Sequence, residues 1–271
     1  MRKESVEEKR RRLLAKARDS LSTAYAGDEH SLIEAISTYL QLEKVENLAF
    51  ERLEEWYSIY FPELKLGNQE KYAKFVAQFG KDKREISAEE LSVLLGDKNK
   101  ANEVVAAATR SIGREPNEEY NNLLDLANLV IDIDKTKKGI EVYIDKTAKK
   151  LMPNITYLID TKIAAELLSK AGSLNKLALM PASTIQLLGA EKALFKHIKY
   201  KSKPPKYGIL FKLPQVSSSS RKMGGKIARI YATKISIASK ADAFSKRFIA
   251  DALKKNIDNI LNKSTRGAKR G

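Results

Sequence analysis

The chain has 271 residues, 43% of them hydrophobic, which is enough for one large domain or two ordinary ones. It has no cysteine and only two histidines, so disulfides, zinc–thiolate centres, iron–sulfur clusters and multi-histidine metal sites are excluded. The net charge of +16 comes from the second half, because residues 1–150 hold 26 Lys and Arg against 28 Asp and Glu, whereas residues 151–271 hold 24 against 6.

The unequal charge of the two halves predicts two domains with different functions. The first half is expected to provide shape or protein contacts, and the second to bind nucleic acid. No apolar run approaches the roughly 20 residues that span a bilayer. The amino terminus, MRKESVEEKRRRLL, lacks the apolar core of a secretory signal. We therefore expect a soluble intracellular protein without a membrane partner.

Helical spacing of apolar residues predicts an amino-terminal helix over residues 2–26, ended by a Gly-Asp pair. Its three consecutive arginines, residues 10–12, are interpreted as a solvated face beside glutamates, with contact to RNA as the alternative. A longer helix is expected over residues 31–61, where Ser31 and Glu34 have the spacing of a capping box. Its packing stripe consists of Leu42, Val45, Ala49, Leu53, Trp56 and Tyr60.

Three short helices with closing glycines follow, over residues 71–80, 87–96 and 101–113. They lie between two long helices and are expected to form a compact tip. The second long helix opens after Pro116 and ends before Pro153. Its seam keeps heptad spacing, with a Lys and a Thr as polar breaks, at Leu123, Leu126, Val130, Ile133, Lys137, Ile140, Ile144, Thr147 and Leu151.

The two long helices are predicted to fold back as an antiparallel coiled coil about 45–55 Å long. A rod of this length serves as a spacer or as a dimerising arm. We expect two copies of the chain to associate through apolar residues of the tip, namely Phe75, Val76 and Phe79.

From Asn154 onward the sequence predicts a globular helical domain, so that the fold class is all-α. Its helices are expected over residues 160–168, 181–198, 226–240 and 242–261, and the irregular stretch between the second and third leaves room for an extended piece at 208–213. The predicted domains are an amino-terminal helix, a coiled-coil domain, a globular RNA- and protein-binding domain and a basic disordered tail, over residues 1–30, 31–153, 154–262 and 263–271.

The most informative stretch lies between Glu191 and Asp242, where the chain has no acidic residue and thirteen cations over fifty positions. Ordinary protein surfaces intersperse the two signs of charge, because like charges repel. A field of one sign therefore predicts a polyanionic partner. For a single lysine, a solvated surface charge remains an equal alternative.

Enzyme signatures are missing from the sequence. There is no GxGxxG after a strand, no Walker A motif and no GxSxG. Residues 223–226, Met-Gly-Gly-Lys, lack the first glycine and the strand of a phosphate-binding loop. His197 has no obvious catalytic partner. We predict a protein that is not an enzyme and that needs no cofactor or metal.

The cations of the basic stretch group into two clusters. Lys192 and Lys196 share a helix face, preceded by the small residues Gly189 and Ala190, which allow close approach of a backbone. A loop stiffened by two prolines carries Lys199, Lys201, Lys203 and Lys206, and Tyr207 beside it has the character of a stacking platform for an unpaired base. The second cluster consists of Arg221, Lys222, Lys226 and Arg229.

Three segments of this stretch closely resemble the Nop domain of box C/D ribonucleoprotein scaffolds. They read MPASTIQLLGAEKALFKHIK, PPKYGILFKLP and GGKIARIYATKISIASKADAF. Residues 31–154 also resemble the coiled-coil domain of those proteins, and the short form is similar to archaeal members. The resemblance implies a location in the interior of an archaeal cell, in the cytoplasm.

The resemblance implies that Gly189 to Lys192 lie on a composite surface that faces a kink-turn RNA and the small ribosomal-type protein bound to it. Residues 204–208 and 225–229 are expected to flank that surface. Glu191 is then a protein-facing or helix-orienting acid. The residues expected to bind RNA or its partner protein are Gln186, Gly189, Ala190, Glu191, Lys192, Lys196, Lys199, Lys203, Lys206, Tyr207, Arg221, Lys222, Lys226 and Arg229.

The chain departs from the family pattern in three places. The family often has His where Tyr207 stands, and a bulky basic residue where Gly224 stands. Family scaffolds also carry an amino-terminal domain that docks the methyltransferase fibrillarin, and the sequence is expected to lack it. Fibrillarin is therefore expected as a partner only if that domain is supplied.

The resemblance implies a homodimeric scaffold that binds a box C/D guide RNA with its kink-turn protein and positions RNA-guided 2′-O-methylation. Two alternatives stay open at this point. One is a splicing-type Nop protein that uses the same binding mode in another particle. The other is a coiled-coil protein with a nonspecific basic RNA-binding domain.

Overall fold

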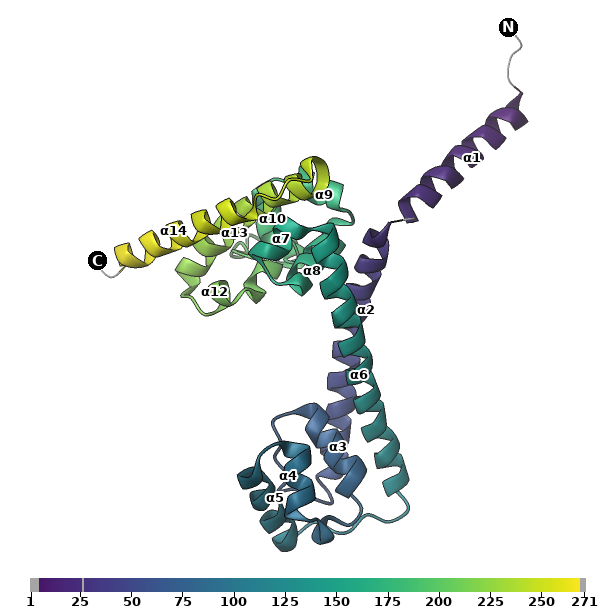
Figure 1. Cartoon of the computed structure of the whole chain (residues 1–271), viewed down its shortest axis with the longest axis vertical. Helices are drawn as coiled ribbons and strands as arrows, with labels where there is room; N and C mark the ends of the chain where they lie inside the picture. The colour runs from purple at the N-terminus through teal and green to yellow at the C-terminus, as the bar shows by residue number, and fades with distance from the viewer. Residues whose placement is uncertain (1–4, 26, 269–271) are drawn as a thin grey trace. The chain divides into compact units, whose positions relative to one another are not determined.

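The computed structural model describes residues 5–25 and 27–268, except for the side chains of residues 19–25, 221 and 263–268. Within these ranges every regular element is a helix and no strand is present, which confirms the all-α prediction (Figure 1). Among the described helices, none combines the length and the apolar character that crossing a bilayer requires.

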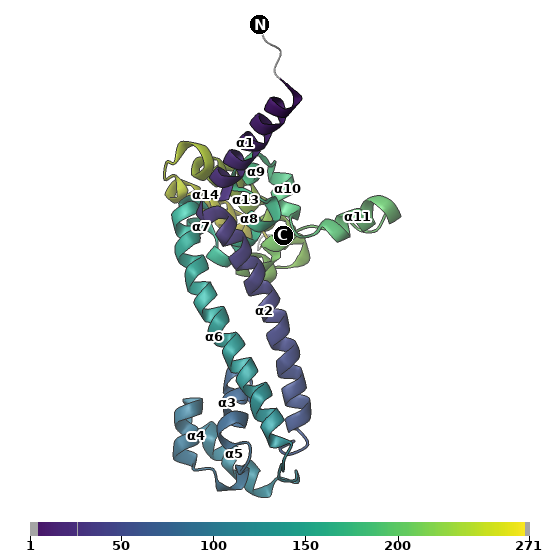
Figure 2. The same cartoon turned by 90° about the vertical axis from the view of Figure 1, so that its right-hand side faces the viewer.

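The chain divides into two compact units. Unit 1 comprises residues 1–38 and 141–271, and unit 2 comprises residues 39–140. Two long helices, α2 (Asp28–Tyr57) and α6 (Tyr120–Leu151), contribute to both units and run side by side within each of them (Figures 1 and 2).

The amino-terminal helix, α1, covers Val6–Tyr25, close to its predicted bounds. The predicted start of the next helix is wrong, because α2 begins at Asp28 and Ser31 lies inside the helix instead of capping it. Asp28 and Glu29 occupy the first turn, where carboxylates interact favourably with the helix dipole. Asp28 also pairs with Lys150 of α6 at 2.6 Å.

Unit 2 forms its tip from α3 (Gln69–Phe79), the 3-10 turn η1 (Lys83–Glu85), α4 (Ala88–Leu95) and α5 (Lys98–Arg110). The three predicted short helices are confirmed, whereas η1 was not predicted. Each of the three α-helices begins with a side chain that accepts hydrogen bonds from first-turn amides, namely Asn68, Ser87 and Asp97. The core beneath them is rich in aromatic rings: Tyr57, Tyr60, Phe61, Tyr72 and Phe75.

This aromatic core corrects the predicted dimer surface. Phe75 and Val76 are fully buried, and the Phe75 ring packs 6.4 Å from Tyr57 and 6.0 Å from Phe61 between centroids. Of the three predicted residues, Phe79 alone is partly exposed. The apolar face of α3 turns inward because the tip has to build its own core. Phe75 and Val76 are therefore unavailable to a second copy of the folded chain.

A buried lysine ties the tip together. Lys83 is fully buried, and its ammonium group donates hydrogen bonds to the carbonyls of Tyr60 at 2.5 Å, Gly113 at 3.1 Å and Arg114 at 3.0 Å. The carboxylate of Glu115 lies 3.5 Å away. All three donors of the ammonium group are thus satisfied inside the protein, and Lys83 joins the end of α2 to the segment that precedes α6.

The seam between the long helices follows α6 as predicted, because all nine predicted positions of α6 are buried or half-buried. On α2 the stripe is displaced. Val45 and Trp56 are 49% and 36% exposed, and Glu46 and Tyr57 are buried in their place. The displacement has an electrostatic cause, since Glu46 forms an ion pair with Lys137 of α6 and therefore faces the seam.

The globular part of unit 1 is built around α13 (Arg221–Lys240), whose buried side chains include Tyr231 and Ile235. The elements packed around it are α7 (Pro153–Leu158), α9 (Leu174–Leu179), α10 (Ala182–Leu187), η2 (Ile209–Lys212), α12 (Pro214–Ser217), the π-helical turn η3 (Ala241–Ser245) and α14 (Ala250–Ala268). α8 (Thr161–Ala171) packs against α7, α9 and η2, and α11 (Glu191–Tyr200) buries no residue.

Several predicted boundaries of unit 1 change. The helix predicted over residues 181–198 is broken at Leu188–Ala190, because Gly189 adopts a φ of +84°. The segment predicted as extended is the 3-10 turn η2. The helix expected from residue 226 begins at Arg221, and Ser220 caps it through the Met223 amide. Residues 263–268, expected as a disordered tail, continue α14 as helix.

Candidate functional site

The second cationic cluster of the sequence surrounds a shallow hollow of about 370 Å³ in unit 1. The hollow lies where the first turns of α13 meet α10 and the loop before η2. Four of its lining residues are cationic and none is acidic. The lining consists of Gln186, Pro205, Lys206, Lys222, Gly225, Lys226 and Arg229.

Gln186 braces this hollow. Its side-chain nitrogen donates hydrogen bonds to the carbonyl oxygens of Lys206 at 2.6 Å and Gly225 at 3.4 Å. Its backbone carbonyl accepts from the Gly208 amide at 3.0 Å. Gln186 therefore joins α10, the loop before η2 and α13. Its predicted contact with RNA or the partner protein stays a prediction, and the structure shows that its side chain positions the walls of the hollow.

The helix α13 presents three cations to the hollow from one face. Lys222, Lys226 and Arg229 follow steps of four and three residues and are all exposed. Gly225 lies beneath them, where an added Cβ would touch the Lys206 side chain at 3.5 Å. Lys222 belongs to the first turn of α13, because this helix begins at Arg221 and not at residue 226 as predicted. The predicted Arg221 side chain lies outside the described residues.

The first cationic cluster lies on an arm, residues 190–207, which carries α11. Two backbone hydrogen bonds close the base of the arm: Gly208 donates to Gln186 at 3.0 Å, and Ile209 donates to Leu188 at 2.7 Å. α11 buries none of its side chains, and Figure 2 shows it extending from the rest of unit 1. An arm that projects from its domain with no buried side chain on its helix is suited to contact with a partner.

Glu191 fixes the start of α11. Its carboxylate accepts a hydrogen bond from the Gly189 amide at 2.6 Å. Burial opposes ionisation of this carboxyl, but hydrogen bonds from the amides of Gly189 and Glu191 and the charge of Lys170 lower its pKa overall. The contact corresponds to the helix-orienting role, one of the two alternatives expected for Glu191.

The exposed surface of α11 has two chemically different faces. Lys192, Lys196 and Lys199 follow steps of four and three residues along one face. Phe195 and Ile198 lie on another and are 61% and 72% exposed. This apolar pair was not predicted, although its two residues have the three-residue spacing of one helix face. One face of the helix is thus suited to phosphates and the other to an apolar partner surface.

The end of the arm is also ordered by specific contacts. His197 Nδ1 contacts the Ser202 carbonyl oxygen, and Lys201 turns the chain with a φ of +51°. His197 therefore stabilises the turn after α11. Lys203, expected to bind RNA, lies exposed in the loop that follows.

Tyr207 is less open than predicted. Its ring stacks on the Phe211 ring, with centroids 5.0 Å apart and planes 13° from parallel. One face of Tyr207 is therefore already covered by a side chain of the same unit. Phe211 remains 47% exposed. The predicted base stacking at Tyr207 stays a prediction, and its surface would be the Tyr207–Phe211 pair and not Tyr207 alone.

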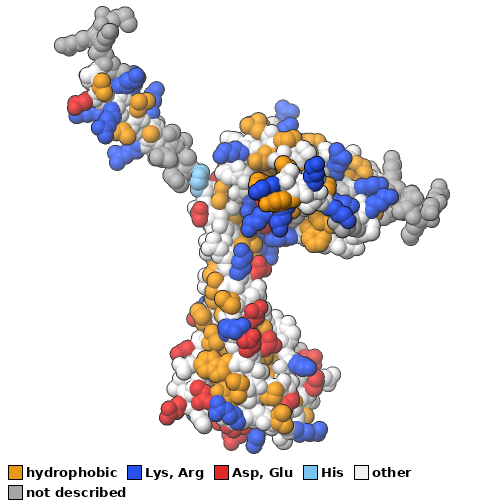
Figure 3. All heavy atoms as spheres, turned by 180° about the vertical axis from the view of Figure 1, so that it is seen from behind, with side chains coloured by type: hydrophobic (Ala, Val, Ile, Leu, Met, Phe, Trp, Pro, Cys, Tyr) orange, Lys and Arg blue, Asp and Glu red, His pale blue; other side chains and the backbone are white. Residues whose placement is uncertain are grey.

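The charges of the two clusters are largely uncompensated within unit 1. Lys212 pairs with Glu166 at 2.6 Å. Among the described residues, no carboxylate pairs with Lys192, Lys196, Lys222, Lys226 or Arg229. Figure 3 shows Lys and Arg side chains gathered on the globular part of unit 1, whereas Asp and Glu gather on unit 2. The positive field predicted from the sequence is thus present on the folded surface.

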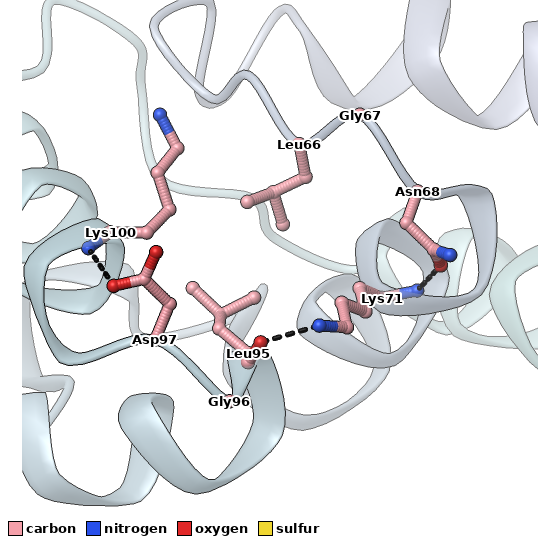
Figure 4. A pocket seen from close by; sticks show the side chains of 8 residues that line it. All are labelled: Leu66, Gly67, Asn68, Lys71, Leu95, Gly96, Asp97 and Lys100. Carbon is pink, nitrogen blue, oxygen red and sulfur yellow. Dashed lines mark hydrogen bonds between the residues drawn. The ribbon is translucent and has the colours of Figure 1, made fainter.

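A second hollow, of about 450 Å³, lies in the tip of unit 2 between residues 66–71 and 95–100 (Figure 4). Its polar side chains form hydrogen bonds with backbone groups at the ends of helices. Lys71 donates to the Leu95 carbonyl at the end of α4, and Asp97 accepts from the amides of Asn99 and Lys100 at the start of α5. We therefore assign this hollow to the construction of the tip.

Comparison with known protein families matches most of this chain, including its two cationic clusters, to one family. The Nop family model, described as "snoRNA binding domain, fibrillarin", matches residues 38–263. The chain belongs to the Nop family. This membership confirms the resemblance seen in the three sequence segments and makes the chain a member of a family of RNA-binding proteins.

The relatives of this Nop-family chain include nucleolar and archaeal proteins. It is 40% identical over 223 residues to nucleolar protein 56 of Dictyostelium discoideum, which covers 80% of this chain and 41% of the relative. It is 39% identical over 237 residues to an uncharacterized NOP5 family protein of Methanocaldococcus jannaschii, covering 85% of this chain and 56% of the relative. The chain thus spans about half the length of these two relatives.

A solved structure shares the fold. The crystal structure of a fibrillarin/Nop5p complex contains a chain that matches with a TM-score of 0.53 at 20% sequence identity. The match covers 94% of this chain and 76% of the other. At this level of identity the similarity establishes the fold alone.

Proposed function

We propose that this Nop-family chain is an RNA-binding scaffold of a box C/D ribonucleoprotein, which binds a guide-RNA kink-turn together with the kink-turn protein. The observation that carries the proposal is α11, which buries none of its side chains and whose two faces differ in chemistry. Ile198, beside Phe195, is aliphatic and offers no stacking surface to a base, so this exposed face is suited to an apolar protein surface.

The RNA side of the proposed site consists of the cationic face of α11 and the hollow at the start of α13. Lys192, Lys196 and Lys199 supply one set of phosphate contacts, and Lys222, Lys226 and Arg229 supply the other. Phosphate contacts fix the position of the RNA and make affinity depend on salt. The absence of partner carboxylates among the described residues leaves these cations available for RNA.

The protein side consists of Phe195 and Ile198. Burial of these two large apolar side chains against a protein stabilises the complex. The cations on the neighbouring face contact phosphates at the same time, so the chain selects a protein that already carries RNA. We infer that the partner is the small ribosomal-type protein on the kink-turn, because RNA and protein are then presented together. On this proposal neither partner alone is sufficient for binding at the higher salt.

The test is a gel-shift titration on a kink-turn RNA, with and without the kink-turn protein, at two salt concentrations. The wild-type chain is expected to bind at the higher salt only when the protein is present. The Lys192→Ala, Lys196→Ala, Arg229→Ala triple variant is expected to weaken binding in both arms, whereas Ile198→Ser weakens only the arm that contains the protein. Lys98→Ala, an exposed cation of unit 2, is the matched control.

Equal binding with and without the protein, lost at the higher salt, would contradict the composite site. That result would assign the chain to the generic basic RNA-binding proteins. Loss of binding for Ile198→Ser in the arm without protein would place the apolar face in contact with RNA.

We further propose that two copies pair along an exposed line on α2 within unit 2. Val45, Leu48 and Trp56 are 49%, 59% and 36% exposed, and Ile59 just beyond the helix is 53% exposed. They lie three, eight and three residues apart, which keeps them on one side of α2 and its continuation, and they form a second apolar stripe that the seam with α6 leaves uncovered. A self-complementary stripe of this kind is suited to a twofold-symmetric pair.

Sedimentation of the intact chain tests this surface. The wild type is expected to sediment as a dimer and the Leu48→Asp, Trp56→Ser variant as a monomer with an unchanged circular-dichroism spectrum. Val93→Asp, a change at an exposed apolar residue of α4, is the control. A wild-type chain that remains monomeric at high concentration would refute the pairing. In the assembled particle, the proposed dimer holds two RNA sites at a fixed separation for guided 2′-O-methylation, and methyl transfer belongs to another subunit.

A further inference from the structure

One face of α13 continues beyond the hollow. The exposed positions Lys222, Lys226 and Arg229 are followed on the same face by Thr233, Ile237 and Lys240, in steps of three and four residues. This face runs the length of the helix. It begins at the hollow and ends at η3, about 20 Å farther along the helix axis.

At the far end of this face, the loop Phe244–Phe248 is held in a fixed conformation. The buried Asp242 carboxylate accepts hydrogen bonds from the Asn154 amide at 3.0 Å, the Asn154 side chain at 2.7 Å and the Ile155 amide at 3.0 Å. Asn154 in turn donates to the Arg247 carbonyl at 2.9 Å and accepts from the Ile249 amide at 2.6 Å. One buried pair thereby pins both ends of the loop to α7.

The loop turns sharply at Lys246, which has a φ of +55°. The Lys246 amide donates to the Ala241 carbonyl at 2.7 Å, and its ammonium group donates to the Asp242 carbonyl at 2.5 Å. The conformation is therefore built by hydrogen bonds from both the backbone and the side chain. A loop ordered in this way loses little further entropy when it binds a ligand.

This ordered loop presents aromatic rings to solvent. Phe244 and Phe248 are 58% and 54% exposed, and Tyr157 of α7 is 50% exposed. The Tyr157 and Phe248 rings meet edge to face, with centroids 5.4 Å apart and planes at 86°. Two large apolar rings on a five-residue loop are costly to leave in water, which indicates that a ligand covers them.

The charges around the rings favour a polyanion over an apolar protein surface. Lys240 and Arg247 are exposed and pair with no carboxylate among the described residues. Asp242 is buried and hydrogen-bonded. Asp251, beside the Tyr157 hydroxyl, is an acidic group that faces the cluster. Cations that flank exposed aromatic rings are the pattern by which proteins hold unpaired nucleotides.

We propose that a single-stranded segment of RNA leaves the hollow, follows the exposed face of α13 and stacks its bases on Phe244 and Phe248. Lys240 and Arg247 contact its phosphates. The proposal rests on the proposed function in one respect, which is that RNA occupies the hollow at the start of α13. It adds a second contact surface, at the other end of the same helix, for RNA without base pairs.

The test uses fluorescence anisotropy of labelled oligoadenylate of roughly 12 nucleotides, a length within the site sizes of single-strand binders. A blunt RNA duplex of equal length is the comparison ligand. The Phe244→Ala, Phe248→Ala variant is expected to bind the single strand roughly tenfold more weakly, because base–aromatic stacking is lost. Its affinity for the duplex is expected to stay unchanged. Phe248→Trp keeps the stacking surface and is expected to retain single-strand affinity when Phe244 is intact.

Three controls separate this proposal from its rivals. Tyr143→Ala removes an exposed ring of α6 and is expected to change neither affinity. Lys226→Ala with Arg229→Ala removes cations from the hollow and is expected to weaken both ligands. Circular-dichroism melting of the Phe244→Ala, Phe248→Ala variant is expected to match the wild type, because both side chains are more than half exposed.

Two results would overturn the proposal. One is unchanged single-strand affinity in the Phe244→Ala, Phe248→Ala variant, which would assign the rings to a protein partner. The other is an equal loss on single strand and duplex. If the hollow variant binds kink-turn RNA like the wild type while the loop variant loses the single strand, the proposed function fails and the loop assignment stands.

Discussion

Two glycines determine the geometry at the base of the α11 arm. Gly189 turns the chain with a φ of +84°, a conformation that side chains rarely adopt. At Gly208 an added Cβ would lie 1.9 Å from the Leu188 carbonyl oxygen. The same carbonyl accepts the Ile209 amide that closes the arm. The two backbone segments at the base of the arm can approach each other this closely only because neither glycine carries a side chain.

Replacing Gly208 by alanine is therefore expected to destabilise unit 1 by about 2 kcal/mol or more, because the backbone must separate to admit the methyl group. The change also displaces the arm and weakens assembly on kink-turn RNA. Thermal melting and the gel shift measure the two effects. Gly139→Ala in α6, where nothing lies within 4 Å, is expected to leave stability unchanged or raise it by up to about 1 kcal/mol. Equal melting temperatures for the two variants would refute the crowding argument.

At the scale of elements, α3 is joined to α6 by a carboxylate. Glu70 of α3 accepts hydrogen bonds from Lys138 of α6 at 2.8 Å and from Lys74 at 2.6 Å. These two contacts, led by Lys138, lower the pKa of Glu70 below its ordinary value of 4.5. Glu63 behaves similarly: burial opposes ionisation, but hydrogen bonds from Ser111 and Ile112 lower its pKa overall.

The sign of the pH dependence follows from these directions. A carboxyl with a lowered pKa in the folded state is protonated first in the unfolded chain, so folding is stabilised above the ordinary value of 4.5 and weakened as the pH falls below it. We expect the melting temperature of unit 2 to decrease between about pH 5 and pH 3. Glu70→Gln should melt lower at neutral pH and show a shallower acid slope. Glu89→Gln, at an exposed position of α4, is the control, and an unchanged slope in Glu70→Gln would contradict the assignment.

At the scale of the whole chain, periodicity and charge in the sequence predicted the helices and the sign of the surface charge. They did not predict which individual side chains are exposed. The seam of α6, the three short helices of the tip and the positive field of unit 1 were predictable, because they depend on regular spacing or on composition. The displaced stripe of α2 was not, since it depends on one ion pair between Glu46 and Lys137 that are far apart in sequence. Phe75 and Val76 were misplaced for a related reason: an apolar tip residue looks the same in sequence whether it faces a partner or its own core.

The candidate site shows the same division. The cations of the hollow were predicted from their one-sign pattern, and the break at Gly189 was missed because helical spacing continues through it. Outside the site, the burial of Lys83 in the tip could not be predicted from the sequence, because the carbonyls that it binds come from two distant segments. Phe195 and Ile198 were visible as an apolar spacing, but their exposure is a property of the arm and not of the local sequence.

The segregation of charge along the chain leads to a final prediction about salt. Each phosphate that a protein neutralises contributes about −0.9 to the slope of log K against log salt concentration for duplex DNA, and about −0.7 for single strands. If RNA binding belongs to unit 1, removing Lys222, Lys226 and Arg229 together should make the slope shallower by about 2 to 3. Removing three exposed cations of unit 2, Lys81, Lys98 and Arg52, should leave it unchanged, although the change in net charge is the same. Titrations of kink-turn RNA at several salt concentrations measure both slopes, and equal changes in the two variants would show that net charge, and not the placement of the cations in unit 1, determines RNA binding.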